Sequence, residues 1–168
     1  MFRSIEDFVT VFNEEANATR KMFAVMSDES LKQAINNDHR TIGRLAWHLA
    51  QTIPEMLGKT GLKCAGPDEH APVPINAEAI QEAYDAAAKS VPGAVKAAGW
   101  TDAVLAEMRP MYGEDWTVEF ALRAFIMHQV HHRGQMTVLM RQAGIKIPGL
   151  YGPAKEDWAT YGMPAPEI

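Results

Sequence analysis

The strongest helical pattern in the chain is the run Phe125-Ile-Met-His-Gln-Val-His-His-Arg-Gly-Gln-Met136. His128 and His132 are spaced i, i+4 within it, so an α-helix would carry both imidazoles on one face, about one turn apart. This helix is expected to extend from about Thr117 to Ala143, because Gly144 is a typical residue to follow a helix C-terminus. The pattern therefore predicts a long helix with two imidazoles that can reach one metal ion.

Three further segments have helical periodicity, and none alternates convincingly as a strand does. These helices are expected at about Ser4 to Met26, Thr41 to Lys59 and Asn76 to Ala98. Pro54 should kink the second, because proline cannot donate a backbone hydrogen bond within a helix. Pro92 is expected to bend the third helix or to end it early.

Together these segments predict an all-α fold, an antiparallel four-helix bundle with a short C-terminal tail helix. Residues 1–168 are expected to form this bundle as a single domain, since no repeat and no second domain is apparent. The tail helix is expected between Ala154 and Tyr161. The segment from Trp100 to Tyr112 fits either a short helix or an extended connection.

Composition argues against several classes of function. The chain has an ordinary apolar fraction of 47% and a net charge of −5, and its Lys and Arg residues are scattered. Sequence-independent binding to nucleic acid needs clustered basic residues, so no nucleic-acid partner is expected. The acidic start of the chain and the lack of an apolar run of about 20 residues predict a cytoplasmic protein without a membrane span.

The single cysteine, Cys64, excludes a disulfide within the chain and a metal cluster built from thiolates. It lies in the Gly- and Pro-flanked segment Gly61-Leu-Lys-Cys-Ala-Gly-Pro67, which is typical of a loop. We interpret it as an incidental thiol rather than as a nucleophile. A reaction that needs a thiol would have to obtain it from a second substrate.

A third candidate ligand, His48, lies in the segment Arg44-Leu-Ala-Trp-His-Leu-Ala50 of the second predicted helix. Neutral imidazole is a common ligand of zinc, nickel and iron, and three such groups would leave coordination positions open. The alternative is that each histidine forms a hydrogen bond within the core, and spacing alone leaves both interpretations open. His39 and His70 lie in loop-like sequence and are expected to be solvated.

Other residues of the motif are weaker candidates. Gln135 lies about 20° from His128 around the helix, which makes it a candidate substrate-binding residue. His131 projects about 100° from His132, at the edge of the bundle or toward a substrate. Gly134 is expected to permit close approach of a neighbouring helix.

Two carboxylates are candidate catalytic groups. Glu15 falls on an apolar face of the first helix and needs a partner: an arginine, a ligating histidine or water on the metal. Glu55 lies about two turns beyond His48 on the same face. Either residue is a candidate general base, and the alternative is a side chain at the solvent margin. Arg133 faces about 140° from His128, which favours a structural salt bridge.

Three elements of the sequence resemble the DinB-like superfamily of metalloenzymes: the His-x3-His-Arg-Gly-Gln run from His128 to Gln135, the upstream His48, and the tail Ile147-Pro-Gly-Leu-Tyr-Gly-Pro153. The resemblance covers nearly the whole chain. It implies a four-helix bundle and a homodimer. It also implies that His48, His128 and His132 bind a divalent metal, most often nickel or zinc, with iron or manganese as alternatives.

The same resemblance suggests a reaction class. Characterised members of the superfamily include S-transferases that use low-molecular-weight thiols and a mycothiol-dependent isomerase, and hydrolases have been proposed. We therefore expect a transferase that acts on a small molecule together with such a thiol. The alternatives are a metal-dependent hydrolase that uses metal-bound water and a non-enzymatic bundle with a structural metal.

Overall fold

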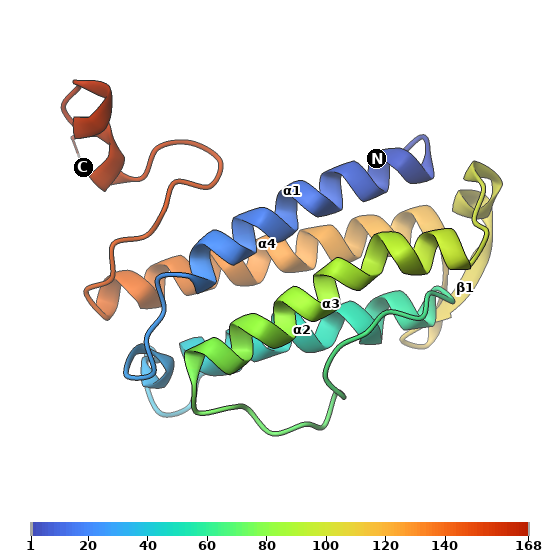
Figure 1. Ribbon diagram of the computed structural model, residues 1–168, viewed down its shortest axis with the longest axis horizontal. Helices are drawn as coiled ribbons and strands as arrows, with labels where there is room; N and C mark the ends of the chain where they lie inside the picture. Colours follow the sequence, from blue (N-terminus) through green and yellow to red (C-terminus); the bar gives the residue numbers. More distant parts are fainter. Residues whose placement is uncertain (1, 168) are drawn as a thin grey trace.

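The computed structural model describes residues 2–167, and four long helices dominate it (Figure 1). The bundle predicted from the sequence is confirmed. The helices are α1 (Ile5–Phe23), α2 (Ile42–Lys59), α3 (Ala77–Ala97) and α4 (Val118–Gln142). Among the described residues no helix has both the length and the apolar character that crossing a membrane would require.

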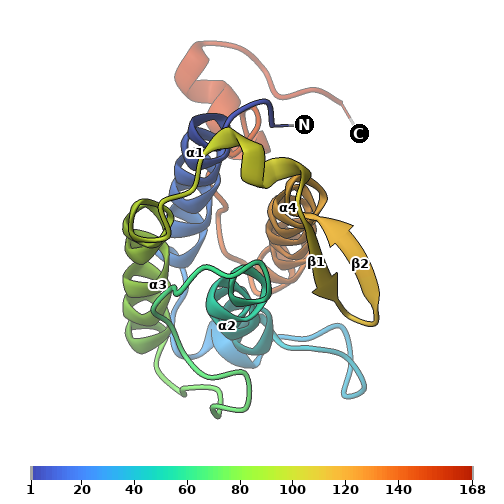
Figure 2. The same ribbon diagram turned by 90° about the vertical axis from the view of Figure 1, so that its right-hand side faces the viewer.

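Two helices of the bundle run in one direction and two in the other. Figure 1 shows α1 and α4 parallel to each other and opposed to α2 and α3. In the end view of Figure 2, α1 and α2 occupy opposite corners, and each of them contacts both α3 and α4. The long connection over residues 60–76 therefore returns along the bundle, so that α3 begins at the same end as α2. This arrangement places α2 antiparallel to α4.

Side chains cap the start of each long helix, which explains why the predicted N-termini are close to the observed ones. Ser4, Thr41, Asn76 and Thr117 each accept a hydrogen bond from a backbone N–H of the first turn. In α1, Asp7 also accepts from the backbone of Ser4 and completes a capping box. The caps satisfy N–H groups that have no partner inside the helix.

Prolines lie inside two of the helices without ending them. α2 continues through Pro54, and α3 continues through Pro92 to Ala97, so of the two alternatives for Pro92 an early end is not observed. Val91 and Val95, on either side of Pro92, are buried in the core. Their packing offsets the one backbone hydrogen bond that proline removes.

Aromatic side chains connect α1 to its two neighbours in the core. The rings of Phe12 and Phe8 are 6.0 Å apart between centroids, and Phe125 of α4 lies 5.8 Å from Phe12. At the other end of α1, Phe23 meets Tyr84 of α3 edge-on at 5.1 Å. All five side chains are almost fully buried, so they contribute strongly to holding these helices together.

A small β-hairpin between α3 and α4 was not predicted. It follows a short 3-10 helix, η2 (Asp102–Ala106), and pairs β1 (Met108–Met111) with β2 (Glu114–Thr117) in antiparallel register. Tyr112 and Gly113 form the two-residue turn with φ values of 52° and 90°, as a type I′ turn requires. Strands of four residues are too short to give a clear alternating pattern.

The C-terminal tail leaves α4 and contains the short 3-10 helix η3 (Lys155–Tyr161), as the sequence predicted. Tyr151 anchors the segment before η3, because its hydroxyl accepts a hydrogen bond from Arg133 of α4 and donates one to Glu15 of α1. Through these two contacts the tail is connected to both α1 and α4.

Candidate metal centre

Three histidines from α2 and α4 converge on one point. The Nε2 atom of His128 lies 3.2 Å from Nε2 of His48 and 3.0 Å from Nε2 of His132. One ligand atom of each residue lies within 4.8 Å of the other two. Among the described residues this group contains no carboxylate and no thiolate. The three histidines predicted as ligands are therefore brought together by the fold.

A buried glutamine beside the histidines fixes α2 against α4. Gln129 is 1% exposed, and its amide nitrogen donates to the carbonyl oxygen of Leu49 at 3.2 Å and to Oγ1 of Thr52 at 3.1 Å. Gln129 and Leu49 are the direct neighbours of His128 and His48 in the chain. Their hydrogen bond thus sets the register in which the histidines of the two helices meet.

The connection after α2 is held against the same helix. Trp47 donates through its indole N–H to the carbonyl of Ala71 at 3.0 Å. The amide of Gln51 donates to the carbonyls of Asp68 and Glu69 at 2.8 and 3.0 Å. These hydrogen bonds hold the connection against the side of α2 that carries Trp47 and Gln51, next to His48.

Gln135 selects the tautomer of His132. Its Oε1 atom lies 2.7 Å from Nδ1 of His132, and an amide oxygen only accepts hydrogen bonds. Nδ1 must therefore carry the proton, which leaves a lone pair on Nε2 directed at the other two histidines. Orientation of a ligating histidine through its second nitrogen is common at metal sites.

The geometry fits a divalent cation. Zinc–nitrogen bonds of about 2.0–2.1 Å in a tetrahedral site separate the nitrogens by roughly 3.3 Å. Two of the three separations between ligand nitrogens, 3.0 and 3.2 Å, are close to this value, and the third is at most 4.8 Å. Nδ1 of His128, the ring nitrogen that does not face the other two histidines, is buried and has no hydrogen-bond partner within residues 2–167. The group is thus able to hold a metal ion.

The electrostatics of the site keep the imidazoles neutral. Burial, followed by the neighbouring histidines and arginines, lowers the pKa of His48 to about 3. Burial and the same kind of neighbours lower the pKa of His128 to about 4, and burial also lowers that of His132, against the opposing hydrogen bond from Gln135. All three lone pairs are therefore available to a metal at neutral pH.

These pKa shifts predict that the metal-free protein loses stability in acid. An unfolded histidine binds its proton near pH 6.5, whereas folded His48 and His128 bind theirs only near 3 and 4. At a pH between the folded and the unfolded pKa values, unfolding therefore takes up protons. As a result, the free energy of unfolding should fall as the pH drops below about 6.5. Urea unfolding of chelator-treated protein between about pH 7.5 and 5.5 measures this slope. His48→Gln should make this pH dependence shallower. An unchanged slope in that variant would contradict the lowered pKa of His48.

Replacement of Gln135 by alanine should weaken metal binding without removing a ligand. Loss of a group that orients a ligating histidine typically costs roughly 10–100-fold in affinity. Gln142→Ala removes an exposed glutamine from the end of the same helix and serves as the control. Competition of both variants against a chromogenic chelator gives the affinities. Equal affinities would show that the Gln135 contact has no such role.

The structure places the two candidate carboxylates in other contacts. Glu15 forms an ion pair with buried Arg133 and accepts a hydrogen bond from the Tyr151 hydroxyl at 2.5 Å. Of the partners considered from the sequence, an arginine is thus the observed one. Glu55 accepts from the Tyr112 hydroxyl at 2.8 Å and lies 3.5 Å from Nζ of Lys59. Neither carboxylate belongs to the three-histidine group.

His131 is exposed on the outer side of α4, with its ring centroid 5.0 Å from that of His132.

Sequence patterns did not single out Arg40, a loop residue whose positive charge helps to lower the pKa of all three clustered histidines. Helical spacing carries no information about a loop, so no signal in the sequence placed Arg40 beside them.

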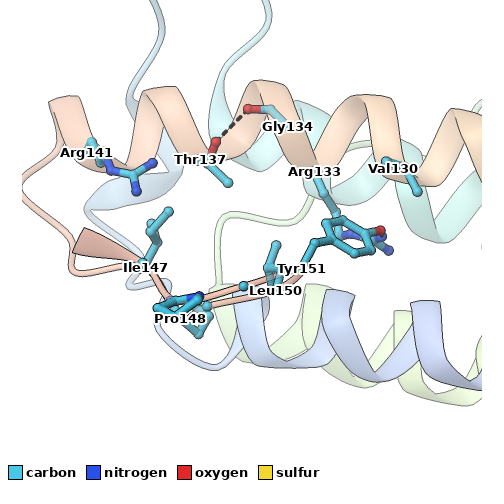
Figure 3. A pocket seen from close by; sticks show the side chains of 13 residues that line it. Val130, Arg133, Gly134, Thr137, Arg141, Ile147, Pro148, Leu150 and Tyr151 are labelled. Atoms are coloured by element: carbon cyan, nitrogen blue, oxygen red, sulfur yellow. Dashed lines mark hydrogen bonds between the residues drawn. The ribbon is translucent and has the colours of Figure 1, made fainter. Parts of the chain in front are cut away.

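Two pockets flank α4 on different sides. A pocket of about 350 Å³ has His132 and Gln135 in its wall and therefore adjoins one histidine of the group. A second pocket, of about 340 Å³, lies between α4 and the tail (Figure 3). It is lined by Arg133 and Tyr151, whose ring centroid is 5.7 Å from the guanidinium, and by none of the three histidines. The first pocket is the one that can serve a metal at the histidine cluster.

Comparison with known proteins identifies the family of the chain. The model of the DinB family matches residues 1–167. The chain belongs to the DinB family. An uncharacterized protein of Bacillus subtilis, YrdA, is 43% identical to it over 168 residues, which is the full length of both chains. The family assignment thus rests on the whole chain rather than on the histidine motif alone.

Solved structures of DinB-like proteins share the fold. A DinB-like protein from Bacillus cereus has a TM-score of 0.84 and 42% identity, covering 90% of this chain and all of that one. A second, YjoA from Bacillus subtilis, has a TM-score of 0.64 and 16% identity over 86% of this chain and 96% of its own. The latter supports the fold alone.

Proposed function

We propose that the chain is a metal-dependent enzyme that transfers a low-molecular-weight thiol to an electrophilic small molecule. The observation that carries the proposal is a group of three neutral imidazoles beside an open pocket. A structural zinc site usually has four protein ligands, whereas the described residues supply three here. The resemblance to thiol S-transferases of the superfamily supports the choice of reaction.

A divalent cation at this position would supply a Lewis acid that lowers the pKa of a thiol or a water that it binds. The chain itself contributes the three imidazoles, the Gln135 contact that orients His132, and a pocket for the second substrate. In the transfer, sulfur forms a bond to carbon as the leaving group departs, and the thiol proton is released. Nickel and zinc both suit three imidazole ligands, with iron and manganese as alternatives.

Cys64 is not expected to supply the thiol. It is partly buried, and burial raises its pKa to about 11 against a weaker, opposing hydrogen bond from Ser90. A thiol that stays protonated at neutral pH is a poor nucleophile. Cys64→Ser should therefore leave the rate of thiol transfer within about twofold of the parent. A complete loss of activity in this variant, with the fold intact by circular dichroism, would place the nucleophile in the chain.

The reaction class can be tested with simple reagents. Zinc- or nickel-loaded protein would be mixed with 2-mercaptoethanol and an activated aryl halide, and thioether formation followed by absorbance. The expected result is a rate that requires the metal and is lost in His128→Ala but kept in His70→Ala. Equal rates with and without metal would contradict the proposal. Metal-dependent hydrolysis of a nitrophenyl ester without any thiol would favour the hydrolase instead.

The homodimer that the resemblance implies is part of the same proposal. Sedimentation of the purified chain measures it directly. A single species at twice the mass of 18.6 kDa is expected, and a monomer at all concentrations would contradict it.

A further inference from the structure

The pocket next to His132 combines polar side chains with an aliphatic wall. Its polar lining residues include His132 and Gln135, so the pocket adjoins the candidate metal centre. The wall consists of four aliphatic side chains: Ile35, Leu45, Val138 and Leu139. A volume of about 350 Å³ is in the range of pockets that take small molecules.

The charge in the pocket has one sign. Among its lining residues in the described chain, Arg40 carries the permanent charge, and none is an aspartate or glutamate; His39 also lines the pocket. The guanidinium of Arg40 is exposed and forms no hydrogen bond or ion pair with any residue from 2 to 167. The nearest acid in the sequence, Asp38, does not line the pocket. This local excess of positive charge stands out in a chain with a net charge of −5.

One further feature favours a negative group in the pocket. Gln135 uses its amide oxygen for His132, which leaves the two N–H bonds of its amide available to a ligand. The pocket thus offers hydrogen-bond donors and a positive charge, with His132 among its lining residues.

From these contacts we infer that the pocket binds a small-molecule substrate with an anionic group, such as a carboxylate, on a short aliphatic body, and that Arg40 selects this group. The inference rests on the proposed function, because it assigns the substrate class of the same site. Guanidinium recognises carboxylates well, since its N–H groups match the two oxygens. The aliphatic wall would cover the rest of the substrate.

The test compares two thiols that differ in charge. Zinc-loaded protein is titrated by calorimetry with 3-mercaptopropionate and with the neutral 3-mercapto-1-propanol. The carboxylate should bind roughly tenfold more tightly, as expected for one hydrogen-bonded charge pair. Arg40→Gln should abolish this preference while the affinity for the alcohol stays unchanged. The matched control is Arg141→Gln, which removes an exposed arginine outside this pocket and should keep the preference.

The outcomes separate this inference from the proposed function. Equal affinity of the parent protein for both thiols, or a preference that survives Arg40→Gln, would overturn the role of Arg40 and leave thiol transfer standing. If neither thiol binds to the zinc-loaded protein, the thiol-transfer proposal fails. In that case butyrate and 1-butanol are compared by saturation-transfer NMR with the same variants. A preference for butyrate that is lost in Arg40→Gln supports the role of Arg40, and any other result overturns it.

Discussion

Replacing Arg133 by methionine is expected to lower the free energy of unfolding by about 3–5 kcal/mol. The Arg133 side chain is 1% exposed and forms an ion pair with Glu15, whose side chain is 15% exposed. It also donates to the Glu15 carbonyl at 2.8 Å and to Oγ1 of Thr19 at 3.0 Å, and it contacts the Tyr151 hydroxyl. Methionine fills similar space but leaves the Glu15 carboxylate without its cation, so the cost is that of an uncompensated buried charge.

Two further variants give the Arg133 prediction its controls. Arg141→Met changes an exposed arginine on the same helix and should alter stability by less than about 0.5 kcal/mol. Replacing Glu15 by methionine together with Arg133 should recover much of the loss, because no charge is then left unpaired. Urea unfolding measures all four proteins. A loss below about 1 kcal/mol in Arg133→Met would show that the ion pair does not fasten α1 to α4.

The second large effect is expected at His128, the histidine whose Nε2 lies within 3.2 Å of both others. Structural zinc sites with four ligands bind with about 10–16 kcal/mol, or roughly 3 kcal/mol for each ligand. His128→Ala should therefore weaken metal binding by about 100-fold or more. The helix content should survive, because the packed faces of the bundle supply most of the stability. Circular dichroism and a chelator competition measure the two quantities.

The matched control for His128 is His70→Ala. His70 lies in the connection between α2 and α3, is exposed and lies outside the three-histidine group. The His70→Ala substitution removes the same chemical group from the chain and should leave the affinity for the metal unchanged. Retained full affinity in His128→Ala would show that the ligand assignment is wrong.

Much of the fold could be predicted because helices leave strong local signals. The apolar stripe of each helix, with candidate N-caps at Ser4 and Asn76, predicts four helices close to the observed bounds. The spacing of His128 and His132 predicts a shared face in the same way. A third histidine on another helix was a stronger hint than a pair alone, and the fold brings His48 to the other two.

Features that depend on tertiary contacts were missed. The hairpin after η2 escaped prediction because its strands have four residues each and its turn begins with Tyr112 rather than with asparagine or glycine. Gly134 was expected to allow close helix approach, but a Cβ at this position would meet nothing within 4 Å. Helical spacing could not place the loop residue Arg40 beside the histidines. Such placements depend on how the chain returns across the bundle rather than on local sequence.

The central claim is that His48, His128 and His132 bind a divalent metal, and elemental analysis tests it most directly. Tag-free protein, purified without a metal column and then incubated with zinc or nickel, would be measured beside His132→Ala. We expect about one metal ion per chain in the parent, lost in the variant. The absence of metal from both samples after incubation, or equal metal content in both, would contradict the account.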